Sequence, residues 1–402
     1  MSDREWDVVL YGATGFTGKQ SAAYFAKHAP EGLKWAIAGR NAAKLEAIRE
    51  AVGRSDIGIL VADALDGPAI ESMVARTRVI LSTAGPFALY GDALVETCVR
   101  YGVHYVDITG ESPWVRSLID RFHEQAAADK TRIVPMCGFD SVPSDLGAFM
   151  VADFIRREWD LETARIRSGF TLSRGGLNGG TLASALNLGE SKQGRAMYDL
   201  ALLNPGGSTK AERDRSPMHT RVVYDEDFQK YLCPFVMAAV NTQVVRRSNA
   251  LFGLEGRAYG GDFIYSEAME AGSRARALVL TGGLAAVGAL LAQPLGRRLA
   301  KRLGPAPGEG PSEEDMDQGY TRTRYVGEAT DGRKVRGEMS YGGDAGNRMT
   351  VLALCECALA LATQLDDMPD RGGILTPATA FEGVLLSRLR RAGMVWKVEA
   401  WT

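Results

Sequence analysis

The sequence has few of the residues on which several common enzyme classes depend. Its 402 residues include only four histidines and five cysteines. No group of these residues has the spacing of a zinc site, so we expect no metal and disfavour a zinc alcohol dehydrogenase. None of the thirteen tyrosines has a lysine four residues later. The Tyr-x-x-x-Lys pair of short-chain dehydrogenases is therefore also missing.

The chain also lacks a strong charge of one sign. Its formal net charge is −2, with 24% charged residues, so no general attraction to nucleic acid is expected. The cysteine count is odd and the cysteines are scattered, which is typical of free thiols in a reducing compartment. The first seven residues are polar and do not form a signal peptide. We therefore expect a cytoplasmic protein.

The first part of the chain alternates between two kinds of pattern. Short apolar runs typical of buried strands are separated by segments with helical periodicity. The runs lie at 8–11, 35–38, 57–62, 79–82, 104–108 and 133–137, and the helical segments at 19–28, 41–52, 70–75, 93–101 and 114–129. This alternation predicts an α/β fold, with a doubly wound parallel Rossmann sheet over residues 1–145.

After residue 145 the pattern changes to one typical of an α+β lobe. We expect this lobe, over residues 146–348, to bind the substrate. Strand-like segments lie at 164–172, 257–271, 319–327 and 334–341, and a long helical segment lies at 179–203. Thr330-Asp331-Gly332 predicts a hairpin turn between the last two strands. Helices at 349–365 and 380–392 are expected to pack back on the first lobe, within a closing segment of residues 349–402.

A glycine-rich turn follows the first predicted strand and opens the first helix. It reads Gly12-Ala13-Thr14-Gly15-Phe16-Thr17-Gly18. Gly12 permits a tight turn, Gly15 lets the backbone approach a pyrophosphate, and Gly18 lets the helix pack closely on the strand. The helix N-terminus offers unpaired N–H groups to the phosphates. The context predicts dinucleotide binding, and a purely structural turn is the alternative.

The end of the second predicted strand selects the dinucleotide. An NAD site usually has an acidic residue there, bonded to the ribose hydroxyls. This chain has Arg40 instead, with Lys44 one turn later and no acidic residue before Glu46. A planar guanidinium suits a 2′-phosphate, so the predicted cofactor is NADP(H). The alternative is an arginine that meets only solvent.

Loops after the later strands complete the predicted site, because ligands of open α/β sheets bind outside the carboxyl ends of the strands. Asp63 and Ala64 are expected near the adenine, and the turn at Thr83-Ala84-Gly85-Pro86 near the nicotinamide. Further loops at 107–111 and 137–145 form the expected rim of the site. Some of their residues act only as turns or helix caps.

These motifs together resemble one family. Residues 12–18, Ala38-Gly39-Arg40, residues 83–87, residues 105–111 and residues 137–145 are similar to the saccharopine dehydrogenase-like oxidoreductases, and most of all to their trans-acting enoyl reductase branch. The resemblance covers nearly the whole chain. It implies a Rossmann lobe and a second lobe that covers the nicotinamide. Enoyl reductases of this branch act in trans with polyketide synthases that make long-chain lipids, whereas saccharopine-type members handle an amino-acid imine.

Reduction of a conjugated C=C bond needs a hydride at the β-carbon, donors for the developing oxyanion, and a proton at the α-carbon. Candidates for these catalytic roles, by position or residue type, are Tyr90, Cys137, Asp140 and Tyr198, and a structural role is the alternative for each. A saccharopine-like site would instead need arginines for carboxylates. Arg167, Arg174 and Arg195 are the candidates for that role.

The longest apolar stretch, residues 277–292, bears on the substrate. Arg297, Arg298, Lys301 and Arg302 follow it directly. It is too short and glycine-rich to identify as a membrane span. A helix with a basic flank can enter a membrane surface or line an acyl tunnel. The alternative is a buried core helix with a solvated end.

We therefore expect an NADPH-dependent reductase of a hydrophobic acyl or polyketide-type substrate, free or carrier-bound, with a C=C bond as its target. The expected location is cytoplasmic, with peripheral contact at the inner face of the membrane left open, as is a homodimer. Two other functions also remain open: a saccharopine-like amino-acid dehydrogenase, and a non-catalytic NADP(H)-binding protein associated with lipid or membrane.

Overall fold

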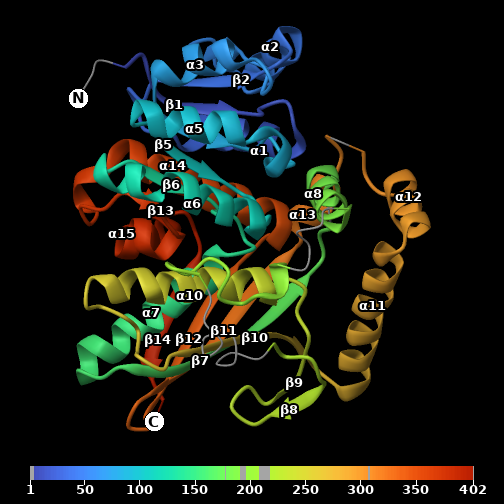
Figure 1. The fold of residues 1–402 in the computed structure, drawn as a ribbon. Helices are drawn as coiled ribbons and strands as arrows, with labels where there is room; N and C mark the ends of the chain where they lie inside the picture. The colour runs from blue at the N-terminus through green and yellow to red at the C-terminus, as the bar shows by residue number, and fades with distance from the viewer. Residues whose placement is uncertain (1–3, 177, 191–195, 208–217, 307, 402) are drawn as a thin grey trace.

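Two seven-stranded sheets form the framework of the protein. The computed structural model describes residues 4–176, 178–190, 196–207, 218–306 and 308–401. The first sheet lies above the second, with several helices between them (Figure 1).

The first sheet is wholly parallel, with the strand order β13-β6-β5-β4-β1-β2-β3. Its strands are β1 (Trp6–Tyr11), β2 (Trp35–Gly39), β3 (Gly58–Val61), β4 (Thr77–Ser82), β5 (His104–Asp107), β6 (Arg132–Val134) and β13 (Gly373–Ile374). The strand order reverses between β1 and β4, so a crevice is expected at the carboxyl ends of these two strands. The predicted doubly wound Rossmann sheet is confirmed.

Helices cover both faces of this sheet, which is why its strands are apolar on both sides. One face packs on α1 (Phe16–His28), α2 (Ala42–Ala51) and α14 (Thr350–Thr363), and the other on α3 (Gly67–Ala75), α5 (Asp92–Tyr101) and α6 (Ser112–Ala128). In β1, Val8 faces the first group and Val9 the second, and both are completely buried. A short helix, α4 (Phe87–Tyr90), follows β4.

The end of the chain returns to the first sheet. Helix α14 is buried along its whole length against this sheet and α1. A π-helical turn, η2 (Ala345–Met349), precedes it, and the 3-10 turn η3 (Leu365–Asp367) follows. Strand β13 then adds a seventh strand beside β6. Helix α15 (Pro377–Arg391) packs on both α14 and α7 (Val142–Trp159), so it joins the two lobes.

The second sheet is mixed, with the order β14-β12-β11-β7-β10-β9-β8. Its strands are β7 (Thr163–Ser173), β8 (Val223–Asp225), β9 (Lys230–Cys233), β10 (Ile264–Ala271), β11 (Tyr320–Ala329), β12 (Lys334–Tyr341) and β14 (Val395–Ala400). The hairpin of β11 and β12 forms where Thr330-Asp331-Gly332 predicts it. Strand β7, which covers the strand-like segment expected at 164–172, is antiparallel to β11 but parallel to β10.

Helices α7 and α10 (Ala238–Leu254) pack on the second sheet, on the side that faces the first lobe (Figure 1). The predicted long helix at 179–203 is shorter than expected, because α8 ends at Glu190. A small helix, α13 (Glu313–Asp317), precedes β11.

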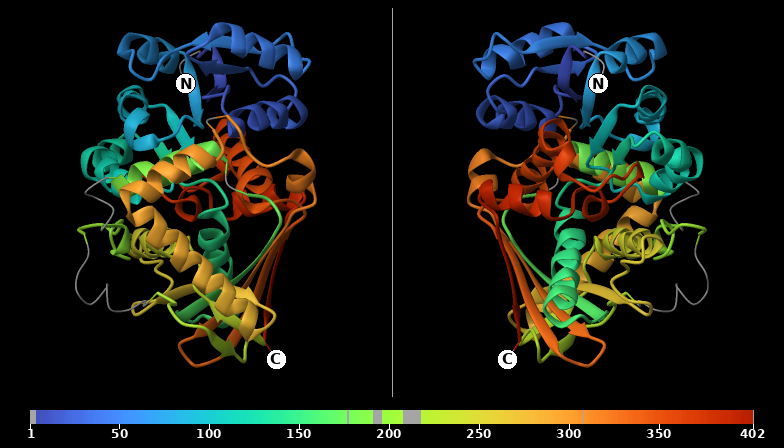
Figure 2. Two further views of the ribbon diagram at one scale, coloured as in Figure 1. Left: turned by 90° about the vertical axis from the view of Figure 1, so that its right-hand side faces the viewer. Right: turned by 90° about the vertical axis from the view of Figure 1, so that its left-hand side faces the viewer.

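Helices α11 (Arg274–Ala292) and α12 (Pro294–Leu303) stand at the outside of the molecule (Figures 1 and 2). Only Ala277 is buried in α11. The alternative that the sequence left open for residues 277–292, a buried core helix, is therefore wrong. Residues 345–363 form an apolar segment of the same length, with a mean hydropathy of 1.3 against 1.8, but 89% of its most apolar 18-residue window is buried. An apolar composition alone does not distinguish the two.

Candidate functional site

The glycine-rich turn lies where β1 ends and α1 begins. Gly12 has φ +86°, a left-handed conformation that favours glycine. Its N–H donates to Ala38 O in β2, and the Gly15 N–H donates back to Gly12 O. Gly15 is the N-cap residue of α1 and offers no side-chain cap to the first turn. The first amides of α1 therefore remain available to an anion.

The space around each glycine tests whether a dinucleotide fits this turn. A Cβ at Gly18 would lie 2.8 Å from Ala13 Cα and closer still to Gly12 O, so Gly18 is needed for helix–strand packing. A Cβ at Gly12 would lie 2.9 Å from Ala84 N. At Gly15 the nearest atom would be Gly12 O, at 3.4 Å. The fold itself does not fill the space over Gly15, which is consistent with the place expected for a pyrophosphate.

The remaining residues of the turn support its shape. Ala13 and Thr17 are buried, whereas Thr14 and Phe16 are half-buried. Thr14 Oγ1 lies beside Gly39 at the end of β2. The turn therefore adjoins the strand end that carries Arg40.

Arg40 is exposed at the end of β2, and no ion pair or hydrogen bond of its side chain is found among the described residues. Its charge acts on the phenol of Tyr11, as does that of Asp63. Burial is the largest cause that raises the pKa of Tyr11 to about 12, and Asp63 raises it further while Arg40 opposes the rise. Arg40 and Asp63 thus both lie near the phenol of Tyr11, at the end where an adenosine phosphate is expected.

Three predicted residues of this end, Lys44, Asp63 and Ala64, have local roles as well. Lys44 is exposed, and its backbone N–H donates to Asn41 Oδ1, which caps α2. The Asp63 carboxylate accepts from the Leu65 N–H, 3.0 Å away. Ala64 is half-buried and packs against the core on that side of the sheet.

The turn after β4 meets the glycine-rich turn from the other side of the crevice. Thr83 Oγ1 donates to Tyr11 O or Gly12 O, at 3.2 and 3.1 Å. Ala84, Gly85 and Pro86 are half-buried, and Gly85 lies close to Ser184 Oγ of α8. The structure therefore brings the predicted phosphate and nicotinamide turns together at the carboxyl ends of β1 and β4.

Glu111 fastens α8 over this turn. Its buried carboxylate accepts from the Phe87 and Ala88 N–H groups, at 2.9 and 3.1 Å. It also accepts from Ser184 Oγ, at 2.9 Å. The sequence places Glu111 only on the rim of the site. Ser184 was missed, because it lies 73 residues away in another lobe and no local motif marks it.

A second loop covers the glycine-rich turn from outside. Gly310 approaches Phe16 so closely that a Cβ there would lie 2.5 Å from the ring. The Gly179 N–H, at the start of α8, donates to Glu309 O at 2.9 Å. Residues 304–312, between α12 and α13, thus contact both the phosphate turn and α8.

The four catalytic candidates lie in different surroundings. Cys137 is completely buried, its thiol donates to Val134 O at 3.2 Å, and burial raises its pKa well above the ordinary value. Such a thiol has no access to a substrate. Tyr90 and Tyr198 are exposed, by 39% and 73%, and they come from separate segments.

Asp140 remains as a titratable group on the loop after β6. It is half-buried, and no hydrogen bond of its carboxylate is found in the described parts of the chain. Burial raises its pKa to about 6. A carboxyl group of this kind is partly protonated near neutral pH, which suits a proton donor.

Neighbouring acidic residues are instead bound within the fold. Asp107 accepts from Tyr105 Oη, the Thr109 N–H and the Met136 N–H, at 2.9, 2.9 and 3.0 Å. Burial raises its pKa to about 7. These contacts hold the loops after β5 and β6 in place, which indicates a structural role.

A buried polar network, which the sequence did not reveal, connects the same loops to the second lobe. Glu267 of β10 accepts from Ser144 Oγ, Asn241 Nδ2 and Tyr265 Oη, at 2.8, 2.7 and 2.8 Å. Burial raises its pKa to about 7. Ser141 Oγ donates to Asn241 Oδ1 at 3.4 Å, so the start of α7 is tied to α10. Sequence reasoning could not find this network, because it joins α7 to α10 and β10, which lie 100 or more residues further along the chain.

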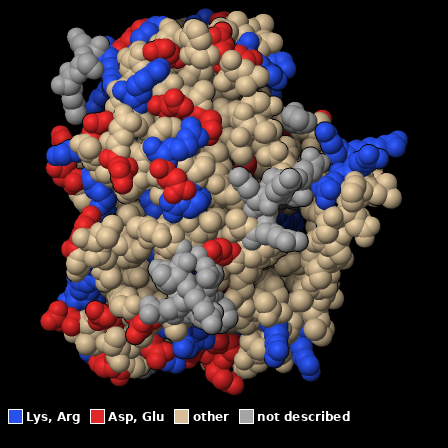
Figure 3. All heavy atoms as spheres, in the orientation of Figure 1, with Lys and Arg blue, Asp and Glu red and all other residues tan. Residues whose placement is uncertain are grey.

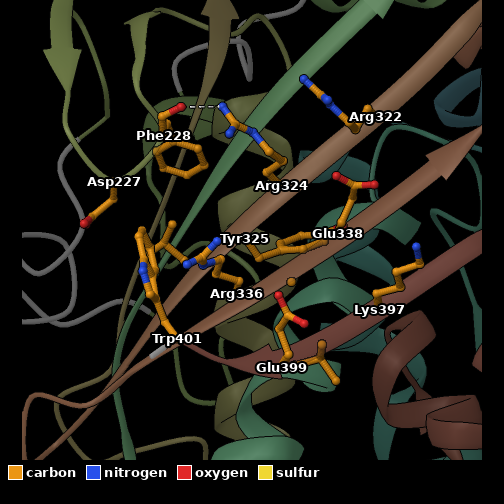
Figure 4. Close-up of a pocket in the computed structure, with 13 residues that line it drawn as sticks. Asp227, Phe228, Arg322, Arg324, Tyr325, Arg336, Glu338, Lys397, Glu399 and Trp401 are labelled. Carbon is orange, nitrogen blue, oxygen red and sulfur yellow. Dashed lines mark hydrogen bonds between the residues drawn. The ribbon is translucent and has the colours of Figure 1, made fainter.

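A cavity of about 470 Å³ lies elsewhere, on the second sheet. Residues of β11, β12 and the C-terminal strand line it, among them Arg324, Arg336 and Trp401 (Figure 4). Arg324 is paired with Glu270 at 2.8 Å. No residue of the glycine-rich turn or of the loops after β4 to β6 lines this cavity, so it is separate from the predicted cofactor site.

The two described arginines of the three expected for an amino-acid dehydrogenase, Arg167 and Arg174, are each bound by other side chains. Arg167 pairs with Asp225 and Asp227. Arg174 donates to Gln318. Arg195 lies outside the described residues.

Comparisons with known proteins agree with this geometry. The family model described as the saccharopine dehydrogenase NADP binding domain matches residues 8–134. A Mycobacterium tuberculosis protein provisionally named a trans-acting enoyl reductase is 38% identical over 97% of each chain. The trans-acting enoyl reductases of Mycobacterium bovis and Mycobacterium ulcerans are each 35% identical over 98% of each chain. The solved saccharopine dehydrogenase (L-Glu forming) of Saccharomyces cerevisiae shares the fold, with a TM-score of 0.54 and 14% identity over 98% of this chain and 99% of that one.

Proposed function

Because the chain belongs to the trans-acting enoyl reductase branch of the saccharopine dehydrogenase-like oxidoreductases, we propose that it reduces a C=C bond conjugated to the carbonyl of an acyl substrate. It is an NADPH-dependent oxidoreductase. The named activity of its relatives supports a hydrophobic acyl substrate, presented as a thioester on a carrier.

The observation that carries this proposal is the meeting of the glycine-rich turn with the turn after β4, at the carboxyl ends of β1 and β4. There the uncapped start of α1, the open space over Gly15 and the exposed guanidinium of Arg40 lie on consecutive strand ends. The amides of α1 would hold the pyrophosphate of NADPH, and Arg40 would pair with its 2′-phosphate. NADPH supplies the hydride when it is bound.

The chain's own residues provide the rest of the chemistry. Glu111 and Ser184 hold α8 over the turn at Gly85, so the helix excludes water from that side of the crevice. We assign the proton for the α-carbon to Asp140, whose raised pKa keeps part of the carboxyl group protonated near pH 7. Asp140 then recovers its proton from solvent, because its side chain is only half-buried.

The alternative amino-acid dehydrogenase is less well supported. Arg167 is neutralised by two aspartates, and Arg174 is bound to Gln318. Neither is available for a substrate carboxylate without breaking these pairs. A polar amino-acid substrate would need such free cations.

The decisive experiment follows NADPH oxidation at 340 nm with 2-enoyl thioesters of increasing chain length, both free and linked to an acyl carrier protein. We expect turnover with NADPH, rising with chain length, and little with NADH. A mixture of a 2-keto acid and an amino acid serves as the control. Turnover of that mixture alone would overturn the proposal in favour of imine reduction, and tight NADPH binding without turnover of any substrate would favour a non-catalytic role.

A further inference from the structure

A basic, apolar arm projects from the second lobe. We define the arm as residues 274–303, which comprise α11 and α12. It contains no aspartate or glutamate, whereas the whole chain has two more acidic than basic residues. Its basic residues are Arg274, Arg276, Arg297, Arg298, Lys301 and Arg302. The arm is thus strongly cationic on a protein that is slightly anionic.

The arm exposes large aliphatic side chains along its whole length. The exposed fractions are 73% for Val279, 54% for Val287 and 75% for both Leu295 and Leu303. Figure 3 shows the arm as a mostly uncharged ridge at the right of the molecule, with basic side chains gathered over α12. Exposed apolar surface of this extent marks a docking site.

Helix α12 separates its two kinds of side chain. Leu295, Leu299 and Leu303 follow each other at intervals of four residues, so they share one face. Arg297 and Lys301 lie about half a turn away, on the opposite face. An apolar face with basic residues opposite and beside it is the pattern of a helix that lies in a membrane interface.

The geometry of the arm is compatible with lying on a bilayer but not with crossing it. Helix α11 is about 28 Å long, close to the thickness of a hydrocarbon core. However, the arm is fastened to the same body at both ends. Ala277 is buried against Cys233 and Ala271, and Gly304 packs against Leu182 of α8. The arm could then cross a membrane only as a hairpin of two spans, and α12, with 10 residues and a length of about 15 Å, is too short for the second span.

We propose that the arm docks the protein on the surface of an anionic phospholipid bilayer. The exposed leucines and valines enter the interface, and the basic residues meet the lipid phosphates. Charge complementarity selects this occupant over a second copy of the chain, because two arms, each with six cations and no acidic residue, repel each other.

Docking would bring the lipid surface next to the candidate site. Leu182 of α8 packs on Gly304 at the end of the arm, and Ser184, half a turn later, is bonded to Glu111. The loop that continues from the arm contacts Phe16 of the glycine-rich turn through Gly310. The membrane-facing arm and the α8 side of the crevice are therefore adjacent. Docking itself does not depend on the reaction proposed above.

Vesicle flotation of the full chain tests this inference. The vesicles are pure phosphatidylcholine, or phosphatidylcholine with 30 mol% phosphatidylglycerol. We expect flotation with the anionic vesicles, little with the neutral ones, and weaker binding at 0.5 M salt. Removal of a basic residue is expected to weaken binding about fivefold.

Two pairs of variants separate the apolar and basic contributions. Leu295→Glu with Leu303→Glu is compared with Leu254→Glu, whose side chain is 73% exposed on α10, outside the arm. Arg298→Glu with Lys301→Glu is compared with Lys27→Glu and Arg391→Glu, which change the net charge equally on other surfaces. Arm variants should lose at least tenfold in partitioning, and the controls should float like the wild type.

Each variant is also checked for NADPH affinity and for molar mass by light scattering. Unchanged NADPH affinity shows that the fold is intact, so a loss of flotation then reports on the arm. The inference is overturned if the wild type does not float, if arm and control variants float equally, or if the wild type is a dimer that the arm variants dissociate. Flotation uses no enoyl substrate, so failure of the proposed reaction would leave this result unaffected.

Discussion

An added methyl group should destabilise the fold at one glycine of the turn, Gly18, but not at another, Gly15. Gly18→Ala would place a Cβ 2.8 Å from Ala13 Cα and nearer still to Gly12 O, and both are backbone atoms that cannot rotate away. The start of α1 must then move back by roughly an ångström, at a cost of about 1–3 kcal/mol. We expect a lower melting temperature together with weaker NADPH binding.

Gly15→Ala should leave the fold intact. Gly15 has φ −74°, which alanine adopts without strain, and the new Cβ would meet only Gly12 O at 3.4 Å. Stability should stay equal or rise by up to about 1 kcal/mol. The methyl group would instead occupy the space over the helix N-terminus and keep a pyrophosphate from the amides. Loss of even one charge-assisted hydrogen bond costs about 1.5–3 kcal/mol, or roughly 10- to 150-fold in affinity.

The assay combines fluorescence titration with NADPH and thermal melting of both variants. The reasoning requires that Gly15→Ala lose affinity without losing stability, and that Gly18→Ala lose both. If Gly15→Ala bound NADPH as the wild type does, the turn would not be the pyrophosphate site, and the proposed reaction would lose its structural support.

Four other substitutions test separate parts of the site. Arg40→Ala should weaken NADPH binding about 10- to 100-fold and leave the affinity for NADH nearly unchanged, as measured by titration with each dinucleotide. Equal losses of affinity for the two would contradict the assignment of Arg40 to the 2′-phosphate. Asp140→Asn should lower kcat by about 100-fold or more. It should also abolish the decline in kcat as pH rises through about 6, because the wild-type carboxyl group loses its proton above that pH. A pH profile like that of the wild type would exclude Asp140 as the donor. The same variant should lose less stability than the wild type from pH 4 to pH 7, because burial of the ionised carboxylate is then avoided. Glu111→Gln should lower the free energy of unfolding in urea by about 1–3 kcal/mol, because an amide NH2 would replace one of two oxygens that accept backbone N–H groups. Ser184→Ala removes one of the three hydrogen bonds of Glu111 and should lower it by about 0.5–1.5 kcal/mol. Equal unfolding midpoints for Glu111→Gln and the wild type would argue against the proposed anchoring of α8.

The first sheet could be predicted because its signals are local. Each strand from β1 to β6 is an apolar run between turn residues, and the observed bounds differ from the expected ones by a few residues. Strand β13 could not be predicted, because two residues, Gly373 and Ile374, show no periodicity. Their pairing with Arg132 and Ile133 depends on contacts about 240 residues apart.

In the candidate site, too, the parts with local sequence signals could be predicted and the parts that depend on distant contacts could not. The turn at residues 12–18 and the arginine after β2 are local patterns, and the structure brings them together in one crevice. The contact of Glu111 with Ser184 needs two lobes to meet. Cys137 was a candidate by position or residue type, and its burial depends on packing with α14. The exposure of α11 could not be predicted from the sequence either, because an apolar helix can lie in a core or on an outer surface.

The return of the C-terminal segment has a consequence for how the protein is made. Residues 373–400 supply β13 to one sheet and β14 to the other, and α14 covers an apolar face of the first sheet. Neither sheet can therefore be completed before these residues have left the ribosome. During synthesis the N-terminal strands emerge first, and the apolar face that α14 later covers stays exposed to solvent until α14 has been made. We therefore expect this protein to depend on chaperones that shield nascent β-sheets.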